Sequence, residues 1–501
     1  MRFFEMLLFF SSVCLLAFQF IVNQRIRRTA LFLTSGAGSI FLVIHLLVEG
    51  YRIQLVFLYG FMLLMLILSL IYALKTPTVV HASRTRRVVW GRLFAGFGLI
   101  VTGCFLYVFP VFNFPKPTGE LKVSTHVFHF IDSSREETFG TTATGKRELM
   151  VQVWYPAQAG SGKYAPFIPD TRILRYMAEN YGLPGFTFQH LKYVSSHTYS
   201  ETEVSSAQTS YPLILANPGF GSSRFLHTSQ AENLASHGYI VAVIDHTFNT
   251  FATEFPDGRI TTSTTNDLFS PDHDYRTERG NRDKLGDVLT DDVTFVLDQF
   301  ELIQSGQIPS RLKGKIDLKH VGVFGHSIGG ATAYDASFDP RITAGIDLDG
   351  GLYRLHDREG LQKPFLFIYS ESEFEQLKMV RDNRVYTDAE LDRMGSTREW
   401  MDQVTEDKKL ELKRIREAVN EGGQVLYIEN TEHLNFTDVQ FISPIFELLG
   451  ITGKIAPERA NSVMNAYMLD FFDMYLKNRD GNLMKEPNSR FPEMKFATPL
   501  L

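Results

Sequence analysis

A serine between two glycines offers the clearest chemistry in this sequence. Residues 325–329 are Gly-His-Ser-Ile-Gly, preceded by the mostly apolar run 321–324 and followed by the small residues 330–333. A serine on a sharp turn between a strand and a helix exposes its hydroxyl, and glycines let the helix approach the strand closely. The start of such a helix also presents N–H groups to a developing oxyanion. The pattern predicts Ser327 as a nucleophile.

A serine hydroxyl is a weak nucleophile until a histidine takes its proton. Only His356 and His433 follow Ser327, and His433 comes just after the predicted strand 424–428. In folds with this turn the chain order is serine, acid, histidine, with the base in a loop late in the domain. We therefore predict His433 as the base. His356 follows the serine too early, and we expect it at the surface or at a pocket rim.

A carboxylate should orient that histidine, and four acidic residues follow predicted strands. Asp347 and Asp349 lie at the end of the strand 342–348. Glu371 and Glu373 follow the next strand. Strand alternation puts Asp347 and Asp349 on the same face, so the residue pattern leaves the choice open. Asp349 is the preferred candidate because it lies nearest the carboxyl end of its strand, where sites of open α/β sheets form.

The tetrahedral intermediate of acyl transfer needs two backbone N–H groups as an oxyanion hole. One is expected from Ile328, which follows the nucleophile. The other is expected from the Pro-Gly-Phe-Gly turn after the strand 212–216, where Phe220 is the best candidate. This chemistry implies neither a metal nor an organic cofactor.

Strands and helices alternate around these residues. Strand-prone runs lie at 125–131, 149–155, 212–216, 239–244, 321–324, 342–348, 364–369 and 424–428. Helical patterns at 224–237 and 287–303 separate some of them, which predicts a doubly wound, mostly parallel sheet, the α/β-hydrolase fold. A charged, helix-favouring insertion spans 371–423. It is expected to be a solvated helical pair or, alternatively, a lid or a docking surface.

The N-terminal region is far more apolar than the rest of the chain. Apolar segments lie at 3–22, 30–48, 55–74 and 93–112. Each has about 20 residues, enough to cross a hydrocarbon core of about 30 Å. We predict a four-helix membrane region, 1–112, then a linker, 113–124, a hydrolase domain, 125–480, and a C-terminal tail, 481–501.

Basic residues are unevenly distributed between these apolar segments. The first and third connecting loops contain Arg25, Arg27, Arg28, Lys75, Arg84, Arg86, Arg87 and Arg92, and the second contains Arg52. The positive-inside rule places the basic loops in the cytoplasm, so the hydrolase domain of this multi-pass cell-membrane protein is expected outside. A count of three segments would place it in the cytoplasm. Glu5 and His45 lie near segment ends, which indicates an interfacial position and an anchoring role for the region.

Net charge and cysteine usage argue against nucleic-acid-binding and disulfide-rich proteins. The chain has 501 residues and a formal net charge of −6, which does not suggest nucleic acid as a partner. The two cysteines, Cys14 and Cys104, both lie in apolar runs and form neither a disulfide framework nor a metal-site pattern. A protein partner for the membrane helices is left open.

Several segments resemble the type II and plasma platelet-activating factor acetylhydrolase family. They are residues 234–242, 325–332, 345–349 (Gly-Ile-Asp-Leu-Asp) and 433–438 (His-Leu-Asn-Phe-Thr-Asp). The resemblance covers about 125–477 and implies a calcium-independent serine esterase, with Asp349 as the acid, that cleaves short or oxidised acyl groups from phospholipids. Asn217-Pro218 stands where the family usually has Ser-His. The apolar segments and the insertion 371–423 are also outside the family's usual domain, so the substrate is less certain than the chemistry.

The sequence therefore predicts a membrane-anchored serine ester hydrolase similar to 1-alkyl-2-acetylglycerophosphocholine esterases. Within enzymes, the alternative is a carboxylesterase or polyester hydrolase that acts on non-lipid esters, and chain-length preference separates the two. An alternative of another class is a membrane receptor or scaffold that only binds a ligand. Its function would survive the substitution Ser327→Ala.

Overall fold

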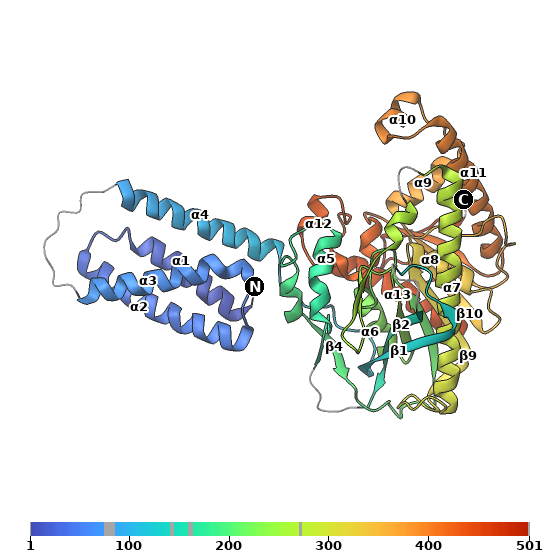
Figure 1. Cartoon of the computed structure of the whole chain (residues 1–501), viewed down its shortest axis with the longest axis horizontal. Coiled ribbons are helices and arrows are strands. Elements are labelled where there is room, and N and C mark those ends of the chain that lie inside the picture. The colour runs from blue at the N-terminus through green and yellow to red at the C-terminus, as the bar shows by residue number, and fades with distance from the viewer. Residues whose placement is uncertain (1, 75–85, 141–144, 159–163, 270–272, 499–501) are drawn as a thin grey trace. The chain divides into compact units, whose positions relative to one another are not determined.

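The computed structural model describes residues 2–74, 86–140, 145–158, 164–269 and 273–498. The chain divides into two compact units (Figure 1). The helical unit comprises Met1–Phe112, Pro184–Val194 and Ile442–Ile445. The sheet unit comprises Asn113–Leu183, Ser195–Phe441 and Phe446–Leu501.

The α-helices of the described chain are α1 (Phe3–Phe18), α2 (Gln24–Ile44), α3 (Val56–Leu74), α4 (Arg86–Val108), α5 (Leu174–Asn180), α6 (Thr228–Ser236), α7 (Tyr275–Ser305), α8 (Ile328–Ala336), α9 (Glu371–Arg381), α10 (Asp388–Met394), α11 (Arg398–Asn420), α12 (Ile445–Leu448) and α13 (Pro457–Lys477). The strands are β1 (Lys122–Glu136), β2 (Lys146–Ala157), β3 (Tyr164–Pro166), β4 (Ser195–Ser200), β5 (Tyr211–Asn217), β6 (Ile240–Asp245), β7 (Ala252–Glu254), β8 (Ile260–Thr262), β9 (Ile316–His326), β10 (Ile342–Leu348), β11 (Phe365–Ser370), β12 (Gln424–Ile428) and β13 (Met494–Phe496).

The helices α1 to α4 pack side by side in the helical unit (Figure 1). Residues such as Leu8, Leu58 and Met62 are buried between them, while many apolar side chains, among them Phe94, point outward. Outward apolar side chains are what a helix needs where lipid surrounds it.

Three helical stretches of the described chain are long and apolar enough to cross a membrane. They are Gln24–Glu49, Ile53–Leu74 and Val88–Val108. The first predicted segment, 3–22, forms the apolar helix α1, which has 16 residues and is shorter than a typical span. Lys75 and Arg84, which enter the topology argument, lie outside the described residues.

One sheet organises the other unit. Its eleven described strands follow the order β13-β12-β11-β10-β9-β5-β6-β2-β1-β4-β3. The six strands from β12 to β6 in this order are parallel. β13 is antiparallel to β12, and β2 is antiparallel to both β6 and β1. The predicted doubly wound, mostly parallel fold is therefore confirmed. β1 begins at Lys122, within the predicted linker, and β13 brings part of the predicted tail 481–501 to the sheet edge.

Helices cover both faces of the sheet, which explains why its central strands are apolar throughout. On β5, Leu213 and Leu215 face the side covered by α7, α8 and α11, and Ile214 and Ala216 face the side covered by α6 and α13. These side chains are fully buried, and burying one leucine or isoleucine contributes about 1.5–3 kcal/mol. The two apolar layers hold the strand ends, and hence the site, in place.

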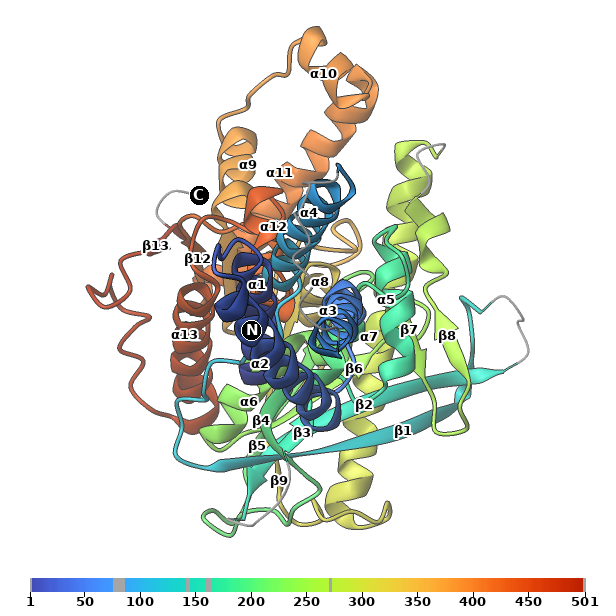
Figure 2. The same cartoon turned by 90° about the vertical axis from the view of Figure 1, so that its left-hand side faces the viewer.

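The insertion 371–423 forms the helices α9, α10 and α11. α9 and α11 pack against one another, and α10 lies at the far end of the pair (Figure 2). Both α9 and α11 also contact β11, which ends beside the predicted acid and base.

Candidate active site

Ser327 lies between β9, which ends at His326, and α8, which begins at Ile328. Its backbone has φ 57° and ψ −126°, a strained conformation for a residue with a side chain and one that clusters at functional sites. A Cβ on Gly325 would come within 1.9 Å of the Gly329 carbonyl oxygen. Glycine at 325 is therefore required for the helix to begin so close to the strand.

Asp349 and His433 are joined by a short hydrogen bond. His433 Nδ1 donates to Asp349 Oδ2 over 2.7 Å, and the Ser370 N–H donates to Asp349 Oδ1 over 2.5 Å. The Asp349 carboxylate is thus fixed from both sides. Because Nδ1 carries the proton that faces Asp349, Nε2 of His433 is the ring nitrogen that can accept another.

Asp347 lies apart from this pair. Its fully buried carboxylate accepts the Gly350 N–H over 2.8 Å, and burial raises the pKa of Asp347 well above its ordinary value. The expectation that Asp347 and Asp349 share a face fails because Asp349 lies just beyond β10, where its φ of 57° turns the chain. Strand alternation no longer applies there.

The other candidate side chains have other partners. Glu371 accepts the Asn430 N–H over 2.7 Å, and Glu373 pairs with Lys408 at 3.2 Å. His356 is largely exposed and hydrogen-bonds over 3.1 Å to the mostly buried Asp407 on α11. The surface position predicted for His356 is confirmed.

His433 has an environment that favours its protonated form. Burial by itself would lower the pKa of His433, but the hydrogen bond and charge of Asp349 outweigh burial, so the pKa is raised above 6.5. His326 Nε2 donates to the His433 carbonyl over 2.9 Å, and the two rings lie 4.5 Å apart. Burial lowers the pKa of His326 well below its ordinary value, so His326 is a neutral support for the loop that carries His433.

The five residues predicted from the sequence line one cavity of about 660 Å³: Ser327, Asp349, His433, Phe220 and Ile328. A Cβ on Gly219 would lie 3.1 Å from Ser327 Cβ, so the loop that carries Phe220 directly contacts the serine turn. Chain segments far apart in sequence thus meet at the carboxyl ends of β5, β9, β10 and β12.

Sequence reasoning missed one wall of this cavity. The residues that α11 contributes are Trp400, Val404, Asp407, Lys408 and Glu411. They recur at helical spacing, which could have identified one face of the insertion as inward-pointing. The adjoining wall includes Phe269, Tyr275, Arg279 and Arg282.

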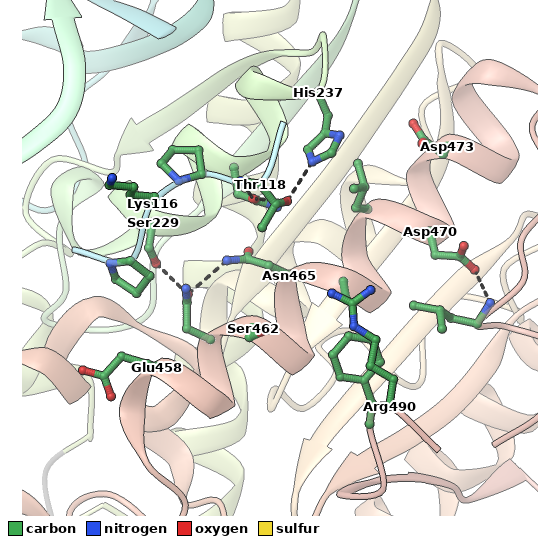
Figure 3. Close-up of a pocket in the computed structure, with 18 of the residues that line it drawn as sticks. Lys116, Thr118, Ser229, His237, Glu458, Ser462, Asn465, Asp470, Asp473 and Arg490 are labelled. Carbon is green, nitrogen blue, oxygen red and sulfur yellow. Dashed lines mark hydrogen bonds between the residues drawn. The ribbon is translucent and has the colours of Figure 1, made fainter. Parts of the chain in front are cut away.

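A second cavity of about 630 Å³ lies elsewhere in the sheet unit (Figure 3). It is bounded by residues 115–118, α6, α13 and residues 482–491, and its lining mixes amides and hydroxyls with charged side chains such as Glu458, Asp470 and Arg490. Thr118, for example, hydrogen-bonds to His237 over 2.8 Å. None of the five predicted site residues lines this cavity.

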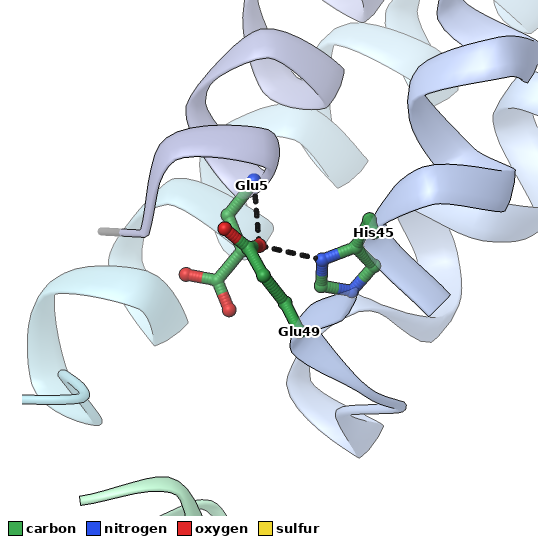
Figure 4. A group of neighbouring side chains, drawn as sticks. All are labelled: Glu5, His45 and Glu49. Carbon is green, nitrogen blue, oxygen red and sulfur yellow. Dashed lines mark hydrogen bonds and ion pairs between the residues drawn. The ribbon is translucent and has the colours of Figure 1, made fainter. Parts of the chain in front are cut away.

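Glu5 and His45 lie at one end of the helical unit, together with Glu49 (Figure 4). His45 Nδ1 lies 2.9 Å from Glu49 Oε2, and Arg52 Nη1 lies 2.8 Å from Glu5 Oε1. Since guanidinium groups occupy the carboxylate of Glu5, we interpret the cluster as a paired network rather than as a metal site.

A serine on a strained strand-to-helix turn, set in a doubly wound sheet beside a histidine–aspartate pair, is the arrangement of serine carboxylic ester hydrolases with the α/β-hydrolase fold. Comparison with known proteins agrees. The family model "Platelet-activating factor acetylhydrolase, isoform II" matches residues 108–262 and 290–489. The chain belongs to this family.

The following relatives have low sequence identity to this chain, but each alignment covers most of it. The chain is 24% identical over 409 residues to a probable 1-alkyl-2-acetylglycerophosphocholine esterase of Arthroderma benhamiae, covering 77% of this chain and 94% of that protein. It is 25% identical over 379 residues to platelet-activating factor acetylhydrolase of Cavia porcellus, covering 70% of this chain and 79% of that protein. Among solved structures, a ferulic acid esterase from Streptomyces cinnamoneus has a TM-score of 0.59 and 27% identity, covering 77% of this chain and 98% of that one.

Proposed function

We propose that this protein is a membrane-anchored serine esterase that removes short or oxidised acyl groups from phospholipid-like esters. The observation that carries the proposal is the 2.7 Å hydrogen bond between His433 and Asp349, in the cavity that also contains Ser327. Relatives named as acetylhydrolases of alkyl-acetyl phospholipids support this substrate class.

In the proposed reaction His433 Nε2 takes the proton of Ser327 Oγ as that oxygen attacks the acyl carbonyl carbon. The N–H groups of Phe220 and Ile328 stabilise the oxyanion. Collapse of the intermediate breaks the ester bond, and His433 gives its proton to the leaving alcohol. Water, activated by the same histidine, then hydrolyses the acyl-enzyme. Asp349 orients the imidazole and stabilises its protonated form.

We further infer that the insertion selects the substrate. Its helix α11 contributes the apolar side chains of Trp400 and Val404 to the cavity, beside charged groups such as Lys408. The adjoining wall comes mainly from residues 263–289, which the family model does not match. This second wall is therefore outside the part that the chain shares with its family, and the acyl and head-group preference is expected to differ from that of its relatives.

The membrane arrangement is also part of the proposal. If α1 is a fourth span and the arginine-rich loops are cytoplasmic, the sheet unit is on the extracytoplasmic side of the cell membrane. An esterase on that side would meet lipids of the outer leaflet or ester substrates from the medium.

The test is labelling of the membrane-inserted full chain with a fluorophosphonate, together with hydrolysis of a phospholipid series with increasing acyl length. Labelling and hydrolysis are expected in the wild type, and Ser327→Ala should lose labelling and at least about 10³-fold in kcat. Absence of labelling in folded wild-type protein would contradict the mechanism and favour a receptor or scaffold.

A second candidate function is suggested by the ferulic acid esterase structure, which this chain covers almost completely. Under that alternative, hydroxycinnamate esters such as feruloyl esters would be hydrolysed with a higher kcat/KM than acetyl phospholipids. The same set of variants and a substrate panel that contains both classes decide between the two.

A further inference from the structure

A buried chain of polar side chains lies behind the loop that carries Phe220. Asn217, the last residue of β5, contacts His246, and His246 contacts Asp292 on α7. All three are at most 1% exposed. None of them lines the cavity with Ser327, and the proposed reaction does not use them directly.

The hydrogen bonds of this chain fix the position of the His246 ring. The Asn217 side-chain amide donates through Nδ2 to the Phe324 carbonyl over 3.2 Å, so its Oδ1 faces His246 Nε2, at 3.1 Å. On the other side, His246 Nδ1 lies 3.0 Å from Asp292 Oδ2. Both ring nitrogens are therefore occupied, and the ring bridges the end of β5 and the helix α7.

Paired charges hold the Asp292 end of this chain. The charged side chains joined by ion pairs to Asp292, directly or through its partners, are Arg135, Arg147, Asp132 and Glu137. Burial would raise the pKa of Asp292, but Arg147 and His246 outweigh burial and lower it, so Asp292 is ionised. Buried charges are tolerated only when they are paired, and Arg135 and Arg147 pair with Asp292 here, which fixes the carboxylate that contacts His246.

His246 holds the loop from both ends. Its side chain contacts Asn217, where the loop begins. Its carbonyl oxygen accepts the N–H of Asn249 over 2.9 Å, and the carbonyl oxygen of Asn249 accepts the N–H of Gly221 over 3.0 Å. Phe220 lies between these two attachments. Because Pro218 has no N–H, the Asn217 side chain is an important anchor for the start of the loop.

We propose that His246 is a positioning residue that holds the oxyanion loop through Asn217 and so aims the Phe220 N–H. The proposal rests on the proposed esterase function. Oxyanion donors act mainly in the transition state, so loosening the loop should lower kcat and leave KM nearly unchanged.

The experiment compares His246→Gln, Asn217→Ala and Asn217→Ser in the full-length protein in detergent. Each kcat is expressed per fluorophosphonate-labelled site, so unfolded protein is not counted. We expect His246→Gln and Asn217→Ala to lower kcat by about 10- to 100-fold with KM changed less than about twofold. Asn217→Ser should recover part of the loss, because a hydroxyl can donate and accept at the same position.

The matched control is Asn465→Ala, which removes another buried asparagine, one that lines the second cavity. Its kcat per labelled site should equal that of the wild type. An unchanged kcat in His246→Gln and Asn217→Ala, a rise in KM alone, or an equal loss in Asn465→Ala would overturn the positioning role while leaving the esterase intact. Wild-type protein that is neither labelled nor active would instead overturn the proposed function and this proposal together.

Discussion

Ser327 and Asp349 both adopt a φ of 57° although both carry side chains. Each such residue costs about 1–3 kcal/mol and persists only where its surroundings fix it. The two follow the neighbouring parallel strands β9 and β10, and the Ser327 N–H donates to the Leu348 carbonyl over 3.0 Å. The sheet thus holds both strained residues at the same edge, with their side chains available to the cavity.

The raised pKa of His433 leads to a prediction about pH. The proposed base must be neutral, so kcat/KM should rise with pH through the His433 pKa, with its acid limb above pH 6.5. Asp349→Asn removes the carboxylate charge that raises the pKa of His433, while burial still lowers that pKa. The acid limb of the Asp349→Asn profile should therefore move to lower pH. We also expect kcat to fall by about 10³- to 10⁴-fold. Rate–pH profiles of both proteins test this, and an acid limb that stays in place would rule out Asp349 as the partner.

At the scale of elements, the serine turn depends on the close approach of α8 to β9. Gly325→Ala would force a Cβ against the Gly329 carbonyl, 1.9 Å away. We expect this variant to lose about 1–3 kcal/mol of stability and most fluorophosphonate labelling. Thermal unfolding and labelling measure both effects.

Gly280→Ala is the matched control for that substitution. Gly280 lies inside α7 with nothing within 4 Å of an added Cβ. Because alanine is the better helix former, this variant should be stabilised by up to about 1 kcal/mol and keep full labelling. Equal losses in both variants would contradict the role given to the turn.

The helix α11 forms a wall of the cavity, and its Trp400 ring packs edge-to-face on Tyr275, with centroids 5.3 Å apart. Trp400→Ala should open space and shift the preference from short toward longer acyl chains by at least about tenfold in relative kcat/KM. Lys413→Ala, on the exposed side of the same helix, should leave the preference unchanged. Hydrolysis rates over an acyl series test this, and identical preferences in all three proteins would exclude α11 as a selecting wall.

At the scale of the whole molecule, the membrane topology depends on whether α1 crosses the bilayer. Both native cysteines are first replaced, by Cys14→Ser and Cys104→Ser. A single cysteine introduced by Lys413→Cys then reports the side of the membrane on which the sheet unit lies. A cysteine introduced by Arg25→Cys reports the side on which the first loop lies. With four spans, an impermeant maleimide should label the Lys413→Cys protein in intact cells and the Arg25→Cys protein only after permeabilisation. Labelling of the Lys413→Cys protein only after permeabilisation would instead place the sheet unit in the cytoplasm.

The sequence alone predicts the features that depend on local patterns. The glycines around Ser327 and the apolar strands are signals carried by adjacent residues, because strand, turn and helix preferences are local. The order of Ser327, Asp349 and His433 can be read directly along the chain. These signals were sufficient for the fold class, and the structure brings all five predicted site residues to one cavity.

Only the tertiary structure decides which distant side chains meet. It separates Asp347 from Asp349 because the chain turns at the end of β10, a change of direction that strand periodicity does not contain. It brings Trp400 to the cavity and His246 beneath the oxyanion loop, since these contacts depend on how helices and strands pack. Local sequence determined the kind of chemistry in this protein, whereas packing decided which side chains orient the reacting groups and which form the cavity walls.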